Sequence, residues 1–265
     1  MKVLKPLLAK IKIFIKELES ILNNNIPYEL REICHLLILS NHWIYYNLIF
    51  SEKLINSLKR NIKRELKKEL LQSPDSTTSK IITDKFLIHI YSHFFIVIDV
   101  GSRLSFPIIN IPVDDKYLKV LYLNPFNFLK KGIEQNKILI NYDKKIIGNI
   151  EEVRNLRNNL IHYWTWNSYL IPRKEEFNFF IPKFYRENKG INLIREKGVD
   201  YINLRDFETG VIQKIKQDPN KLPLIELNKM VNNDFKSIRK YIDIFLDGSL
   251  NNLNNWVSNL DTYYK

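Results

Sequence analysis

One short stretch, residues 151–166 (EEVRNLRNNLIHYWTW), gathers the side chains of this chain that are best suited to chemistry. Arg157 is followed directly by Asn158, and His162 comes five residues after the arginine. Arginine keeps its charge and presents a planar fork of donors that matches phosphate oxygens. Histidine gives or takes a proton near neutral pH. These residue types predict a site that binds a phosphate group and moves a proton, with the Asn158 amide orienting the phosphate or the imidazole.

The surrounding residues predict a helix from residue 144 to about residue 169. Four apolar residues at spacings of three, four and four form one stripe along it: Val153, Leu156, Leu160 and Trp164. Four polar residues at spacings of four, three and four form a second stripe on another face: Glu151, Asn155, Asn158 and His162. A surface helix usually carries Lys and Glu at such positions. Asparagine and histidine there indicate a half-buried polar groove.

Helix geometry limits how these residues can act together. Side chains five positions apart on an ideal helix point about 140° away from each other, at about 100° per residue. Arg157 and His162 of one chain therefore do not converge well on one phosphate, whereas Asn158 and His162 share a face.

The chain as a whole is strongly basic. Its 265 residues include 41 Lys and Arg against 29 Asp and Glu, and the net charge of +12 favours a nucleic-acid partner. The alternative is that an AT-rich coding sequence supplies the lysines. Cys34 is the only cysteine, so an internal disulfide is impossible, which fits a reducing, cytoplasmic compartment.

No signal peptide or membrane-spanning segment is predicted. Residues 1–26 contain five lysines and two glutamates and have no uninterrupted apolar run. The most apolar window, residues 86–98, is shorter than a membrane span and contains His89 and His93. We expect it to be a buried helix.

Helical periodicity predicts a mainly all-α fold, an antiparallel helical bundle formed by a single domain over residues 1–265. Further helices are predicted over residues 2–22, 28–71, 81–104 and 125–135, and from 223 to a cap at Gly248, with a shorter piece at 249–260. Residues 1–72 form an N-terminal helical extension. Residues 172–222 carry short aromatic and β-branched segments between prolines and glycines, which predict an irregular or β-like insertion. Three roles are open for this insertion: covering a binding cleft as a regulator, extending a dimer interface, or recognising a partner.

The arrangement of Arg157, Asn158 and His162 resembles the signature of the HEPN superfamily (higher eukaryotes and prokaryotes nucleotide-binding). That signature is an arginine, a polar residue and a histidine four to six residues later, carried by a small helical bundle. The match covers these few residues and, loosely, the helical pattern of residues 81–169 and the last long helix. Many members are metal-independent endoribonucleases. The resemblance therefore implies RNA as substrate, no cofactor, no metal, and a role as a toxin or abortive-infection effector against phage.

Cleaving RNA without a metal needs a base for the 2′-hydroxyl proton, an acid for the leaving 5′-oxygen, and a cation for the charge that builds on phosphorus. By resemblance, Arg157, Asn158 and His162 are the catalytic residues. Members are typically two-fold dimers whose motifs line one cleft, so the resemblance also implies a homodimer. Two chains in one cleft would overcome the divergence of Arg157 and His162.

Neighbouring residues complete the predicted site. Arg154, Tyr163 and Trp164 are predicted to bind RNA, the arginine through the phosphate backbone. The rings of Trp164, Trp166 and Tyr169 are predicted to stack on a base at the mouth of a cleft. The alternative for the rings is packing in the core or in a dimer interface. Glu151, Glu152 and Asn155 are predicted to support the site, the glutamates by pairing with an arginine.

Partner proteins are implied by the same resemblance. An antitoxin or another protein of a defence system would be such a partner. The toxin branch that pairs with a nucleotidyltransferase antitoxin carries tyrosine two residues after the histidine, where this chain has Trp164. This departure counts against modification by such an antitoxin and leaves the nuclease implication unchanged.

Three alternatives compete with a nuclease site. The first is a non-catalytic HEPN-type module, which would bind RNA or nucleotides or act as a scaffold in a defence complex. The second is a purely structural helical dimer. In the structural case, Arg157 and His162 merely satisfy local carboxylates and carbonyls. A metal site is the third alternative, because His89 and His93 lie four residues apart, but their flanks are apolar and core histidines are predicted instead.

Overall fold

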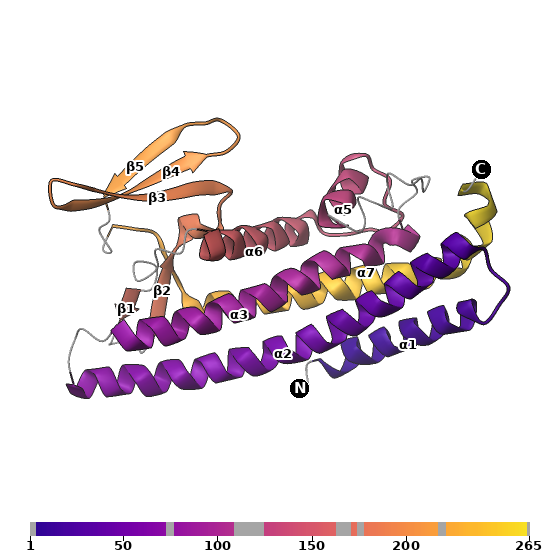
Figure 1. Ribbon diagram of the computed structural model, residues 1–265, viewed down its shortest axis with the longest axis horizontal. Coiled ribbons are helices and arrows are strands. Elements are labelled where there is room, and N and C mark those ends of the chain that lie inside the picture. The colour runs from indigo at the N-terminus through magenta and orange to yellow at the C-terminus, as the bar shows by residue number, and fades with distance from the viewer. Residues whose placement is uncertain are drawn as a thin grey trace. The chain divides into compact units, whose positions relative to one another are not determined.

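The computed structural model describes residues 4–72, 77–108, 125–162, 171–173, 178–216 and 221–263. In this part the chain is mainly helical with a small antiparallel β insertion, as predicted (Figure 1). The α-helices are α1 (Lys5–Leu22), α2 (Tyr28–Gln72), α3 (Thr77–Ser102), α5 (Pro125–Glu134), α6 (Lys144–His162) and α7 (Leu227–Tyr263). The strands are β1 (Ile171–Arg173), β2 (Asn178–Pro182), β3 (Lys189–Glu196), β4 (Val199–Asp206), β5 (Ile212–Lys216) and β6 (Leu224–Glu226).

The chain divides into two compact units. Unit 1 comprises Met1–Phe50, His93–Ile147 and Ser237–Lys265, and unit 2 comprises Ser51–Ser92 and Gly148–Lys236. Helices α2, α3, α6 and α7 each contribute residues to both units, so neither unit is one continuous segment. The single domain over residues 1–265 with an extension over 1–72 remains a prediction.

Unit 1 is built on amphipathic packing of α1. Its buried residues Leu7, Ile11, Phe14 and Leu18 repeat at helical spacing and face the core. On a more exposed side, Lys10 Nζ lies 2.7 Å from carboxylate oxygens of both Asp243 and Asp247 on α7. The hydrogen bonds to the two carboxylates raise the pKa of Lys10. These ion pairs tie α1 to α7.

The last helix differs from the prediction at both ends. Residues 224–226 form β6 instead of the helix start, because they pair with β2. Gly248 does not cap the helix, which continues to Tyr263. A Cβ atom at position 248 would lie 2.8 Å from Ile140 Cγ2, so the glycine allows close packing rather than a chain reversal.

Helix α3 begins at Thr77, earlier than predicted, and is followed by a 3-10 helix, η1 (Arg103–Ile108), that contains Pro107. Its predicted core face is confirmed at Ile90, Phe94, Val97 and Ile98, whereas Phe86 is half-buried. In the described ranges one segment, Thr83–Ile108, has the length and composition of a membrane span, contrary to the expectation from the sequence. Half of its most apolar window is buried inside the protein.

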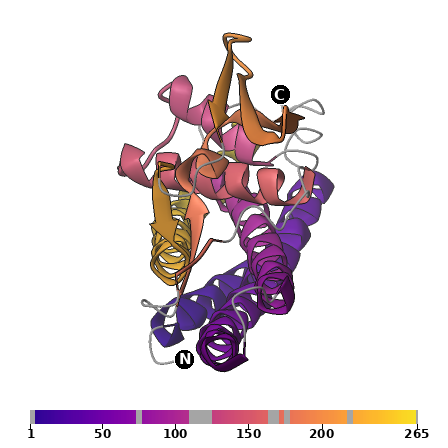
Figure 2. The ribbon, with the colours of Figure 1, turned by 90° about the vertical axis from the view of Figure 1, so that its left-hand side faces the viewer.

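The region of the predicted insertion, extended to residues 171–226, forms two separate three-stranded antiparallel sheets in unit 2 (Figure 2). One has the order β1-β2-β6 and the other β3-β4-β5. All residues of β2 are buried, which the run of aromatic and aliphatic residues in FFI explains. A one-turn 3-10 helix, η3 (Lys183–Arg186), connects the two sheets between β2 and β3.

The β3–β4 hairpin turns through two residues with positive φ, Lys197 (φ 49°) and Gly198 (φ 79°). This is the conformation that matches the right-handed twist of the flanking strands. The buried residues Ile191 and Leu204 are directly paired across the hairpin, which fixes its register.

A buried polar network joins η3 to two helices of unit 2. Arg186 Nη1 and Nη2 donate to the two carboxylate oxygens of Asp234 on α7 at 2.7 and 2.9 Å. Tyr91 of α3 donates its hydroxyl to the same carboxylate at 2.5 Å. Burial by itself lowers the pKa of Arg186, but the hydrogen bonds to Asp234 outweigh this effect and raise it above its ordinary value. The guanidinium therefore stays charged inside the protein.

The turn predicts the effect of replacing its glycine. Gly198→Ala should lower the free energy of unfolding by about 1 kcal/mol, because a Cβ atom is strained at this φ. Urea unfolding of the full chain measures it. Gly148→Ala in α6 is the matched control, since nothing lies within 4 Å of its added Cβ. The control should stabilise the helix by about 0.5–1 kcal/mol. Equal effects of the two changes would contradict this account.

The network predicts a large cost for removing its carboxylate. Asp234→Ala should destabilise the protein by about 3–5 kcal/mol, because it leaves the buried Arg186 without its main partner. Asp243→Ala on the same helix is the control, where a partly exposed pair with Lys10 is lost and about 0–1 kcal/mol is expected. Thermal or urea unfolding compares the two variants. A loss for Asp234→Ala no larger than for Asp243→Ala would rule out a stabilising role for the network.

Candidate functional site

Helix α6 carries the candidate site and is held in unit 2 by its apolar stripe. Val153 and Leu156 are completely buried and Leu160 is almost so, which confirms three members of the predicted stripe. The fourth, Trp164, lies outside the described residues. The remaining faces of the helix are therefore left to polar side chains.

Asparagines of α6 hold the backbone of η3. Asn159 is buried, and its Nδ2 donates to the carbonyl oxygens of Tyr185 at 2.8 Å and Glu187 at 3.3 Å. Asn155 Nδ2 donates to the carbonyl oxygen of Arg186 at a longer 3.4 Å. These bonds satisfy carbonyls that a short 3-10 helix leaves without partners. Part of the predicted polar groove is thus filled by the insertion itself.

Two of the three predicted catalytic residues, Arg157 and Asn158, are in direct contact. Arg157 Nη1 donates to Asn158 Oδ1 at 3.0 Å, and both residues are half-buried. The bond sets the orientation of the Asn158 amide. The arginine therefore positions the asparagine, in addition to any contact it makes with a phosphate.

The other predicted site residues are placed as follows. His162 is the last described residue of α6, and its side chain lies outside the described part, as do Tyr163 and Trp164. Arg154 and Glu151 are half-buried on the same helix. Glu152 pairs with an arginine, as expected of it, but that arginine is Arg186 of η3, with Nε at 2.9 Å from Oε2.

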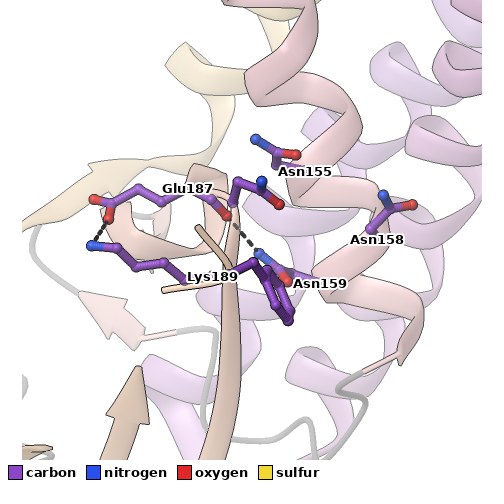
Figure 3. Close-up of a pocket in the computed structure, with 7 residues that line it drawn as sticks. Asn155, Asn158, Asn159, Glu187 and Lys189 are labelled. Carbon is purple, nitrogen blue, oxygen red and sulfur yellow. Dashed lines mark hydrogen bonds and ion pairs between the residues drawn. The ribbon is translucent and has the colours of Figure 1, made fainter. Parts of the chain in front are cut away.

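A pocket of about 240 Å³ opens beside Asn158 (Figure 3). Its walls come from α6, from the start of β3 and from the turn after β4: Asn155, Asn158, Asn159, Glu187, Asn188, Lys189 and Phe207. Two of the seven, Asn155 and Asn158, belong to the predicted site. Asn159 lies in the same motif, and its spacing of four from Asn155 was a signal that they share a face. The other four come from the insertion, and no sequence pattern linked them to α6.

The charges in this pocket cancel each other. Lys189 Nζ and Glu187 Oε2 form an ion pair at 2.5 Å. Figure 3 shows the charged ends of these two side chains meeting on the side away from Asn158. The groups left to face a ligand are carboxamides and the Phe207 ring, so this pocket suits a neutral, polar molecule better than a phosphate.

The two histidines of α3 and the single cysteine are the remaining candidate reactive groups. His93 Nδ1 lies 2.6 Å from Asn47 Oδ1, and its ring stacks on Phe50 with centroids 5.8 Å apart. The prediction that both histidines of this pair are core residues is wrong for His89, which is exposed. Among the described residues no group of three or more His, Cys, Asp or Glu could hold a metal ion. Burial raises the pKa of the Cys34 thiol to about 12, so a thiolate does not form there near neutral pH.

The docking bonds of Asn159 predict a measurable stability effect. Asn159→Ala should cost about 1–3 kcal/mol, because the carbonyls of Tyr185 and Glu187 lose their donor inside the protein. Faster amide hydrogen exchange is expected over residues 183–189. The control is Asn158→Ala, whose amide bonds only the neighbouring Arg157 among the contacts described, and whose unfolding free energy should change by less than half as much. Unchanged exchange in Asn159→Ala would contradict the docking role.

Comparison with known proteins finds no relative of this chain. No family model, no curated protein and no solved structure matches the chain.

Proposed function

We propose that this protein is a metal-independent endoribonuclease of the HEPN type. The observation that carries the proposal is the bonded pair of Arg157 and Asn158 on α6, with His162 on the same helix. A half-buried arginine beside a pocket can bind a phosphate while the pocket holds the rest of a nucleotide. The net charge of +12 supports a polyanionic substrate.

The proposed reaction is an internal phosphoryl transfer. A base removes the 2′-hydroxyl proton, the 2′-oxygen forms a bond to phosphorus, and the bond from phosphorus to the 5′-oxygen breaks. An acid gives that oxygen a proton, so the products are a 2′,3′-cyclic phosphate and a 5′-hydroxyl. His162 takes the role of acid or base, Arg157 stabilises the charge on the phosphoryl oxygens, and Asn158 orients one of these groups.

A homodimer is part of this proposal. Arg157 and His162 lie about 140° apart around one helix, so a second copy of the motif is needed to surround one phosphate. We further propose the antiparallel helical bundle of the HEPN superfamily as the arrangement of the helices. The cellular role follows the same resemblance: a cytoplasmic toxin or anti-phage effector that responds to an antitoxin or another defence protein.

RNA cleavage in the presence of EDTA tests the proposal. The purified chain should cut RNA and leave 2′,3′-cyclic phosphate ends, and His162→Ala should reduce the rate by at least 100-fold, as roughly expected for loss of a general acid or base. His89→Ala, at an exposed histidine of α3, is the matched control and should cleave like the wild type. Equal cleavage by His162→Ala and the wild type would refute the assignment.

A non-catalytic RNA-binding module is the second candidate. The pocket favours it, because four amide side chains and a phenyl ring are groups that bind rather than react. This candidate expects salt-dependent RNA binding without cleavage, and binding that survives His162→Ala. The same cleavage assay therefore separates the two candidates.

A further inference from the structure

We propose that the pocket beside Asn158 binds one unpaired base of an RNA strand, stacked on Phe207 and read by the asparagine amides. The inference deepens the proposed function, and it rests on RNA being the ligand of this site. Its grounds are the charge balance of the pocket, its amide groups, and the exposed Phe207 ring on a hydrogen-bonded turn.

The first ground is neutrality. The two charged residues of the pocket, Glu187 and Lys189, are paired with each other. A phosphate group would meet the carboxylate of Glu187 as well as the ammonium of Lys189. A nucleobase carries no charge, so the pair neither attracts nor repels it. The phosphates of the strand are then bound outside the pocket by other basic residues.

The second ground is the supply of carboxamides. An asparagine side chain offers a donor and an acceptor in one plane, which matches the polar edges of bases. Asn159 is committed to two carbonyls of the insertion and acts as a wall. Asn158 has its oxygen bonded to Arg157, and Figure 3 shows its nitrogen on the side toward Asn155. Asn155 has its nitrogen bonded to the carbonyl oxygen of Arg186, which leaves its oxygen for a ligand. Asn188 is exposed and lines the pocket with a fourth amide.

The third ground is the exposed ring. Phe207 is 56% exposed, although its side chain is apolar. It stands on a tight turn in which the Asp206 carboxylate accepts the backbone N–H groups of Glu208 at 2.9 Å and Thr209 at 2.8 Å. These hydrogen bonds, the one from Thr209 foremost, lower the pKa of Asp206, so its charged form holds the turn at neutral pH. The backbone that carries Phe207 is therefore fixed before a base arrives, and only the side-chain rotamer has to be ordered when a base stacks on the ring.

The pocket lies next to Arg157, the residue proposed to bind the reacting phosphate. Arg157 bonds Asn158, and Asn158 lines the pocket. A base seated there brings the phosphate of its own nucleotide, or of the next one, to the guanidinium. The pocket would therefore select which base lies next to the cleaved bond.

Binding of RNA that cannot be cleaved tests this inference apart from catalysis. The probe is a short, fluorescently labelled single-stranded RNA with 2′-fluoro groups, which lack the attacking hydroxyl, measured by fluorescence anisotropy in EDTA. Phe207→Ala should weaken binding about tenfold, within the range of roughly 5- to 150-fold that loss of a base–aromatic stack gives. Phe207→Trp should retain binding, since an indole also stacks.

The matched control is Val211→Ala, because Val211 is 63% exposed, lies in the same β4–β5 hairpin and does not line the pocket. It should bind like the wild type. The bases of the probe are then replaced one at a time by abasic sites. At the position whose base occupies the pocket, the abasic site should weaken binding by the wild type. With that probe, Phe207→Ala and the wild type should bind with equal affinity.

Equal binding by Phe207→Ala and the wild type, or no binding by the wild type, would overturn the base pocket. If Phe207→Ala binds normally while cleavage still depends on His162, the nuclease stands and the base pocket falls. If binding depends on Phe207 but the wild type cleaves no RNA, the base pocket stands and the nuclease falls.

Discussion

The contact on which the rest of unit 2 depends is the buried pair of Arg186 and Asp234. Taking two charges out of water costs several kcal/mol each, and only complete hydrogen bonding makes such a pair tolerable. Here the guanidinium makes two bonds to the carboxylate and one to Glu152, and Tyr91 adds a further bond to the carboxylate. Four elements, α3, α6, α7 and η3, are thereby held at one point. Since each charge needs all of its partners, the position of η3 is sharply determined.

The candidate site is a consequence of that docking. Once Arg186 fixes η3, the carbonyls of Tyr185 and Glu187 face α6, and Asn159 satisfies both. The start of β3 and the turn carrying Phe207 then complete a pocket whose other wall is Asn155 and Asn158. Neighbouring residues of one motif therefore divide their roles. Asn159 joins the insertion to the helix, while Asn158 lines the pocket and bonds Arg157.

The helices could be predicted well because their signals are local. Pro27 before Tyr28, and the long periodic pattern after it, placed α2 to within a residue at each end. The errors arose where a distant segment changed the outcome. Pairing with β2 turned residues 224–226 into a strand, and close packing against Ile140 explains Gly248 inside a helix that the glycine was expected to end. Neither partner can be recognised from the residues next to these positions.

By itself the sequence determined the mainly helical class, the extended character of the insertion and the buried stripe of α6, because periodicity and turn residues act over a few positions. It also determined that an arginine, an asparagine and a histidine share one helix. Only the tertiary structure decided what these residues face. Glu187, Lys189 and Phe207 reach the site from sequence positions 29 or more residues beyond Asn158, through a docked 3-10 helix and a hairpin turn. Long-range contacts of this kind depend on the burial of a few polar groups. Such groups form no periodic pattern in the sequence, so the contacts cannot be predicted from it.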